Sequence, residues 1–440
     1  MTKEEKYSIA KWAMEHALRN GAQQASVSIY EDNSSRIEVR DEKIDKLEEA
    51  NRNSMSIALY VDKKYSSIST NRLNNRKELG KFIEEAIAGT RYLSEDVFRS
   101  LPEPELYYRG GGDDLRTLDN GFRNIDPQHK INLAYSIEQE VLGKDERIIS
   151  VTASYRDSKT GNVMVTSNGF EGDTETSYYS LIAEVSVKSG DARPESYWYE
   201  SSIFHNELIK EGIGQQALKR ALDKLGQKKL KSGKMPMIVE NRVVGRTLLQ
   251  PLISALSGKS IQQKNSFLIG MEGKKIGSDL FTLVDDPTIV SGRGSRHFDS
   301  EGLATVKRTI LDAGILKDYY IDTYYGKKLE MKPTSGGTTN LVFKPGENDL
   351  EGMLASIDRG ILVTGFNGGN SNGTTGDFSF GIEGFLVENG NLTRPVSEMN
   401  ITGNFKQLWK DLSAVGNDVY TGSSWRLPSL VFDNVDFSGI

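Results

Sequence analysis

The chain has 440 residues, which is enough for two or three domains with a sizeable core. It carries 55 Lys and Arg against 61 Asp and Glu, and its formal charge of -6 argues against a dedicated nucleic-acid binder. It has no Cys, so disulfides, cysteine nucleophiles and thiolate zinc sites are excluded. Any metal or histidine chemistry must draw on four residues, His16, His129, His205 and His297.

Targeting signals are not evident in the sequence. The first residues show no basic segment followed by an apolar one, and no stretch approaches about 18 continuous apolar residues. We therefore expect a cytoplasmic protein without a membrane span.

The first part of the chain alternates helical and strand periodicity. A helix is predicted over residues 2–20, where Thr2 and Glu5 form a capping box and Asn20-Gly21 ends the pattern. Apolar residues at every second position predict strands, and residues 62–64 predict a turn between two of them. These strands are expected at residues 26–30, 36–40, 55–61 and 65–69, before a second helix at 76–92.

The next part repeats this arrangement. Asp126-Pro127 predicts the start of a helix, and Asn168-Gly169 predicts a turn between strands. The strands are expected at residues 149–155, 162–167 and 178–188, and a long helix at 206–225. The lysine-rich polar stretch 227–234 is then predicted to be a linker, because the amino-acid composition changes sharply there. We expect an N-terminal α/β region at 1–226 and a β-rich domain at 235–440.

The second half is richer in glycine and in short strands. A strand is predicted at 235–240 and a helix at 242–257, interrupted by Pro251. Short strands separated by Gly and Asn turns follow, which is typical of a curved, barrel-like or sandwich sheet. The fold class expected is α+β, with an N-terminal α/β domain followed by a β-rich, barrel-like C-terminal domain.

Three loop motifs are candidates for ligand binding. Gly258-Lys259-Ser260 resembles the end of a phosphate-binding loop, but Ile253 stands where that loop needs Gly and the preceding segment is helical. No nucleotide site is expected there. The Gly, Asn and Thr loops at 335–340 and 367–376 either line a peptide groove through their backbone groups or are simple turns.

A polar cluster follows at His297, Asp299 and Glu301. Carboxylates beside a histidine and Arg296 are a signal for a catalytic site, although a polar hairpin loop gives the same pattern. A catalytic role requires the three side chains to converge in one cleft.

Several stretches of the second half together resemble the TldD/PmbA family, whose members are known as modulators of DNA gyrase. They are Thr-Leu-Val-Asp-Asp at 282–286, Phe-Asp-Ser-Glu-Gly at 298–302, Asp-Ala-Gly-Ile-Leu at 312–316, Gly-Asp-Phe-Ser-Phe at 376–380, Gly-Phe-Leu-Val-Glu-Asn-Gly at 384–390, Arg-Pro-Val at 394–396, Gly403-Asn404 and Gly-Asn-Asp at 416–418. The resemblance implies an N-terminal α/β part and a barrel-like C-terminal domain. It also implies two branches: TldD is a zinc metallopeptidase with an HExxxH helix and a downstream cysteine ligand, whereas PmbA, or TldE, lacks the ligands and pairs with TldD. The pair cleaves unfolded peptides.

The zinc helix decides which branch the chain resembles. Matching the HExxxH pattern to residues 245–258 puts Leu249, Gln250 and Ser254 at its three positions. Leucine cannot ligate zinc, and glutamine and serine do not replace carboxylate and imidazole. The chain therefore resembles the PmbA branch, and no catalytic residue, metal ligand or cofactor is expected. The helix is then either a buried core helix or the wall of an apolar cleft that faces substrate or partner.

The resemblance implies a non-catalytic subunit of a peptidase complex. Its partners are expected to be a TldD-like zinc metallopeptidase subunit and an unfolded peptide, with neither nucleic acid nor membrane. In isolation the chain is a candidate homodimer, because a surface for a homologous subunit is often self-complementary. Two alternatives stay open: an independent metal-free hydrolase using His297, Asp299 and Glu301, and a protein-binding modulator of DNA gyrase.

Overall fold

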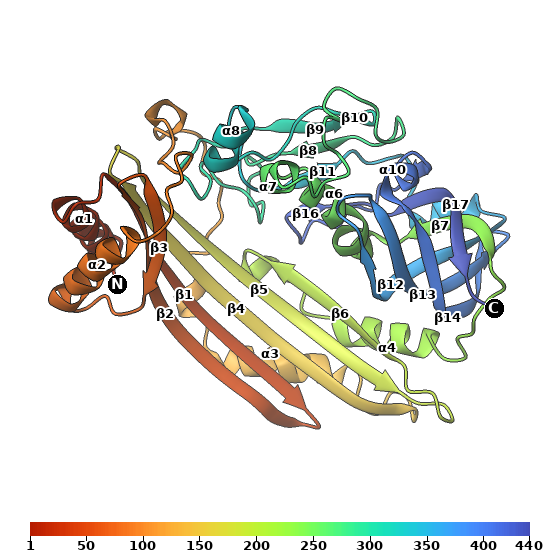
Figure 1. Cartoon of the computed structure of the whole chain (residues 1–440). Coiled ribbons are helices and arrows are strands. Elements are labelled where there is room, and N and C mark those ends of the chain that lie inside the picture. Colours follow the sequence, from red (N-terminus) through yellow and green to blue (C-terminus); the bar gives the residue numbers. More distant parts are fainter.

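The computed structural model describes residues 1–440, and a six-stranded antiparallel sheet forms the frame of the first half (Figure 1). Its strands run in the order β3-β2-β1-β4-β5-β6. Their bounds are β1 Gln24–Arg40, β2 Lys43–Val61, β3 Lys64–Thr70, β4 Ile148–Thr166, β5 Glu171–Val187 and β6 Glu195–Ser202. The strands predicted at 149–155 and 162–167 are one strand, because the polar residues between them pair with the equally polar middle of β1.

Four helices cover one face of this sheet. They are α1 (Lys3–Arg19), α2 (Arg76–Thr90), α3 (Pro127–Gln139) and α4 (Ile213–Asp223). The first pair packs on Val27 and Ile29 of β1, and the second pair on Ile37 and Val39 of the same strand. All four of these residues have odd numbers and so point to the same side. The helix pairs thus cover opposite ends of one face, and the residues between them, such as Ser28 and Ser34, leave the other face polar.

The helix ends show how local sequence fixes these elements. The predicted capping box of α1 is confirmed, since Thr2 accepts from the Glu5 N–H and Glu5 accepts from the Thr2 N–H. Asp126 caps α3 ahead of Pro127, also as predicted. The helix predicted from residue 206 is wrong in its first turns, because Gly212 adopts a left-handed φ of 81° and α4 begins only after it.

The second half contains a closed five-stranded barrel, which confirms the predicted β-rich, barrel-like domain. Closure occurs because β14 pairs with both β13 and β17. The barrel order is β14-β13-β12-β7-β17, and β15 adds to β17 outside the ring. The bounds are β7 Gly233–Val239, β12 Arg359–Ser371, β13 Asp377–Glu388, β14 Asn391–Asn404, β15 Leu412–Val415 and β17 Leu430–Ser438.

A smaller five-stranded sheet lies beside the barrel. Its order is β10-β9-β8-β11-β16, with bounds β8 Leu283–Asp285, β9 Arg308–Asp312, β10 Ile315–Leu316, β11 Leu341–Phe343 and β16 Trp425–Arg426. Short helices lie in the connections of these two sheets, and they are α7 Gly258–Gln262, α8 Thr323–Leu329, α9 Leu350–Ala355 and α10 Phe405–Leu408. None of the helices combines the length and apolar character needed to cross a bilayer.

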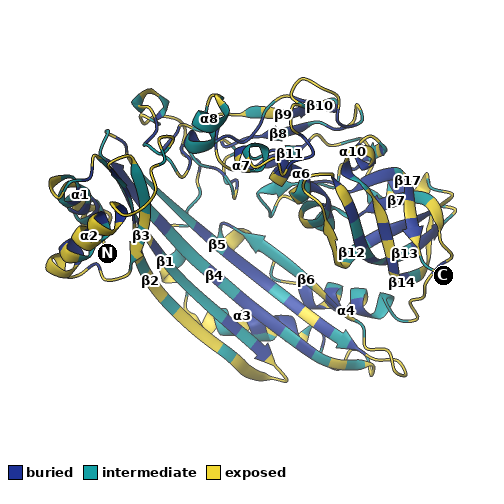
Figure 2. Ribbon diagram, in the orientation of Figure 1, coloured by how far each residue is buried: buried dark blue, intermediate teal, exposed yellow.

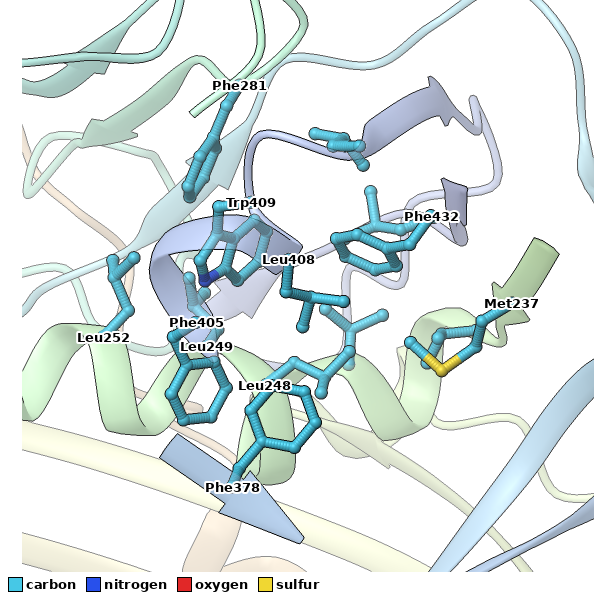
Figure 3. Packing of buried hydrophobic residues seen from close by; sticks show 14 of the residues in the cluster. Met237, Leu248, Leu249, Leu252, Phe281, Phe378, Phe405, Leu408, Trp409 and Phe432 are labelled. Carbon is cyan, nitrogen blue, oxygen red and sulfur yellow. The ribbon is translucent and has the colours of Figure 1, made fainter. Parts of the chain in front are cut away.

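The predicted helix at 242–257 is observed, and it packs against the barrel core. It consists of α5 (Asn241–Val244), a π-helical turn (Gly245–Leu249) and α6 (Gln250–Ala255). Pro251 does not break it; instead the turn before the proline widens, and the Gln250 N–H bonds to the Gly245 carbonyl five residues back. Its buried leucines, among them Leu249, meet Trp409, Phe405 and Phe432 (Figure 3).

One sheet edge stays open. Strand β3 pairs only with residues 55–61 of β2, so residues 43–54 of β2 have β1 on one side and no strand on the other. This part of β2 is mostly exposed (Figure 2).

Candidate functional site

The three positions matched to the zinc motif point in different directions. Leu249 is fully buried and belongs to the core of the second half. Gln250 and Ser254 are exposed on the opposite side of the helix, and the Gln250 Nε2 donates to the Ser254 Oγ at 3.1 Å. The helix is therefore neither wholly sealed nor wholly open, because one face packs in the core and the other faces solvent.

A groove of about 570 Å³ runs beside the exposed face of α6. Gln250 and Ser254 line it, whereas Leu249 and Leu252 do not. The cleft is therefore polar and not apolar as expected, because the leucines are buried in the core and the serine and glutamine face the groove. The lining residues are Gln250, Ile253, Ser254, Ser257, Lys259, Ser260, Gln263, Asn265, Tyr320, Gly336, Gly337, Thr338 and Trp425.

The floor of the groove is set by Tyr320. Its backbone accepts the Gly258 N–H at 2.8 Å and donates to the Leu256 carbonyl at 3.0 Å, which ties the segment after α6 to the chain before α8. The Tyr320 side chain is almost fully buried, and burial raises the pKa of its phenol well above the ordinary value. Its hydroxyl has no hydrogen-bond partner.

The opposite wall comes from the loop at 335–340 and from Trp425 of strand β16. Trp425 Nε1 contacts Thr338 Oγ1 at 3.4 Å, and Arg296 donates to the Gly337 and Thr338 carbonyls at 3.3 and 2.9 Å. The loop predicted at 335–340 as either turn or groove wall thus contributes to the groove. Sequence reasoning missed Tyr320 and Trp425, since only pairings distant in sequence bring them here. Lys259 belongs to the wall but not to a phosphate loop, because Ser257 caps a short helix there.

The polar cluster at 297–301 does not form one site. His297 lines a cleft of about 830 Å³ and stacks on Tyr108, with ring centroids 5.1 Å apart. Neither Asp299 nor Glu301 lines that cleft. Asp299 accepts the N–H groups of Glu301 and Leu303 and so holds its own turn together. The alternative of a polar hairpin loop describes this segment better than a catalytic triad does.

Glu301 contacts the start of α8, and the pKa of its carboxyl group is raised there. Its carboxylate accepts the Thr323 N–H at 2.8 Å, at the start of α8. Burial, followed by the charges of Asp299 and Asp322, raises its pKa to about 7. Burial also raises the pKa of Asp299, whose Oδ2 has no partner. Both groups lie in a junction between the halves, where Tyr108 N–H bonds to the Gly302 carbonyl at 3.0 Å.

Family comparisons match most of the chain. The model of the PmbA/TldA metallopeptidase central domain matches residues 120–225, and that of the PmbA/TldA metallopeptidase C-terminal domain matches residues 232–439. The chain belongs to the PmbA/TldD family. The metalloprotease PmbA homolog of Haemophilus influenzae is 31% identical and aligns with 97% of this chain and 95% of its own.

Solved structures of the PmbA/TldD family show the same fold. A Bacteroides thetaiotaomicron protein named as a modulator of DNA gyrase superposes with a TM-score of 0.98, at 52% identity over 100% of both chains. TldE from Thermococcus kodakarensis superposes with a TM-score of 0.85, at 21% identity over 98% of this chain and 100% of its own, which is a likeness of fold alone.

Zinc, the metal that the PmbA/TldD resemblance implies for the catalytic branch, does not fit the side chains of this chain. No group of three or more His, Cys, Asp or Glu side chains is arranged to hold a metal ion. The two histidines that do approach each other, His129 and His205, have ring centroids 5.3 Å apart. Burial, and the nearby charges of Lys210 and His129, lower the pKa of His205. No metal-dependent step can be derived from these residues.

Proposed function

We propose that this chain is the non-catalytic, PmbA/TldE-like subunit of a two-protein metallopeptidase. Its partner would be a TldD-like zinc subunit, and the complex would process or degrade unfolded peptides. The chain would supply one wall of the peptide path, while the partner supplies the metal and the base.

One observation carries the proposal. The position of the first zinc ligand is Leu249, which is fully buried in the core, and the other two positions are an amide and a hydroxyl. A zinc peptidase needs about three protein ligands and an open position for water. The helix that carries those ligands in the catalytic branch instead packs here against the barrel, and its remaining face is a groove.

A peptidase assay tests the proposal directly. The purified chain, a TldD-like subunit and the co-expressed pair are each assayed on an unfolded peptide, and bound zinc is measured in each. We expect zinc in the partner, cleavage by the pair, and neither zinc nor cleavage with the isolated chain. Cleavage by the isolated chain at the same rate as by the pair would contradict the proposal. Size-exclusion chromatography of the same samples tests whether the isolated chain forms a homodimer.

The gyrase name of the Bacteroides thetaiotaomicron relative supports a second candidate, a protein-binding modulator of DNA gyrase. Capture of purified gyrase by the isolated chain, without a TldD-like protein, would favour it. The net charge of -6 favours protein contact over contact with DNA.

A further inference from the structure

The groove beside α6 differs from the other main cavities in its charge. Of the five main cavities, it is the one without Asp or Glu in its lining. The chain as a whole has 61 acidic residues and a net negative charge, so an acid-free cavity runs against its composition. Lys259 is the single charged residue of the lining.

Behind the groove the charges are of both signs, since Asp299 lies close enough to Arg296 to interact with it, and Lys259 is the one charge in the lining itself. Lys259 is exposed and has no carboxylate within ion-pair distance. Behind the wall, the Arg296 guanidinium holds the Gly337 and Thr338 carbonyls, and its Nε is buried without a partner. The carboxylates of Asp285 and Asp318, which act on Tyr320 from the core side, lie 3.9 and 2.7 Å from Arg308, whose single positive charge offsets one of the two.

The remaining lining is suited to hydrogen bonding with a polypeptide. Hydroxyls come from Ser254, Ser260 and Thr338, and amides from Gln263 and Asn265. Such groups donate to both carboxylate and main-chain carbonyl oxygens. Trp425 adds a half-buried aromatic surface that can cover the apolar part of a residue. The volume of about 570 Å³ lies in the usual range for ligand sites.

We propose that this groove binds an acidic segment of an unfolded peptide. Lys259 pairs with a carboxylate of the peptide, the hydroxyl and amide groups donate to the other oxygens, and Trp425 covers the stem of a side chain. The proposal rests on the proposed function in taking the ligand to be a peptide, and it adds a charge preference that the fold alone does not require.

Fluorescence anisotropy with the isolated full-length chain tests it. The probes are short unstructured peptides with the same dye and the same Gly and Ser content, carrying Glu, Gln or Lys at matched positions. We expect the Glu peptide to bind at least about tenfold more tightly than the Lys peptide at low salt, with the difference shrinking at high salt. Lys259→Glu should weaken binding of the Glu peptide about tenfold, and Ser254→Glu, which adds a carboxylate to the α6 side of the groove, should weaken it too.

Lys188→Glu is the matched control, because Lys188 is exposed at the far tip of the long sheet and the change in net charge is the same. It should leave both affinities unchanged. Equal binding of the Glu and Lys peptides, or equal effects of Lys259→Glu and Lys188→Glu, would overturn the inference. Thermal melting of each variant verifies folding. Because no zinc subunit is present, failure of these binding tests is distinct from failure of the peptidase assay on the pair.

Discussion

Glu301 shows how a single residue links pH to the stability of this chain. Its carboxyl group titrates near pH 4.3 in an unfolded chain and at a pKa of about 7 in the folded one. Between these values the folded state binds more protons, so raising the pH through this window destabilises it. Above pH 7 the penalty is complete and constant, and below about pH 4 it is absent.

Glu301→Gln removes that penalty and keeps an oxygen for the Thr323 N–H. We expect the variant to be more stable than the parent at pH 8, by up to about 3.7 kcal/mol at 1.36 kcal/mol per pKa unit, and to lose this advantage as the pH falls to about 4. Denaturant midpoints measured at several pH values check this. The exposed Glu146→Gln serves as the control, and a gain independent of pH would show that ionisation of Glu301 is not the cause.

Among the secondary-structure elements, the helical segment from α5 to α6 contributes strongly to stability, because its apolar face completes the barrel core. Leu249→Ala should destabilise the second half by about 2–5 kcal/mol, since it opens a cavity in fully buried surroundings. Gln250→Ala, one residue later on the exposed face, should change stability by less than about 0.5 kcal/mol. Thermal unfolding of both variants provides the comparison, and equal losses would mean that the helix does not pack as described.

Elements with strong local signals could be predicted from the sequence. The sequence predicts the capped helices α1 and α3 and the turn at Asn168-Gly169, because caps and turns depend on neighbouring residues. The class of the barrel was predictable, but its closure was not, since β14 meets β17 far along the chain. For the groove, Gln250 and Ser254 were found from the family motif. The burial of Leu249 in the core and the position of Tyr320 beside the groove depend on tertiary packing, which no local sequence pattern encodes.

At the scale of the whole molecule, the two halves are joined by an aromatic cluster. Phe298, from the turn that also holds Glu301, packs edge-on against Phe170 of the first half, with ring centroids 5.0 Å apart. Beside them the Ala304 N–H bonds to the Leu106 carbonyl at 3.0 Å. The polar cluster noticed in the sequence therefore belongs to a structural junction.

Phe298→Ala should loosen this junction, because it removes a buried aromatic contact worth about 3–5 kcal/mol. We expect limited proteolysis within residues 109–117 to become at least about tenfold faster, since that loop is next to the cluster. Tyr92→Ala, at a side chain that is 91% exposed, is the control and should leave the cleavage rate unchanged. An unchanged cleavage rate in the Phe298 variant would mean that other contacts hold the two halves together.

The open edge of β2 has a consequence for how the molecule behaves in concentrated solution. Exposed strand edges are templates for fibril growth, and natural sheets guard against it with charge. Along residues 43–54 the edge carries Lys43, Asp45, Lys46, Glu48, Glu49 and Arg52, so signs are mixed within a short distance. A second copy that approaches in an arbitrary register meets like charges as often as opposite ones. The mixed charges of this edge thus oppose association in concentrated solution, and a strand that pairs with it must carry opposite charges at the facing positions.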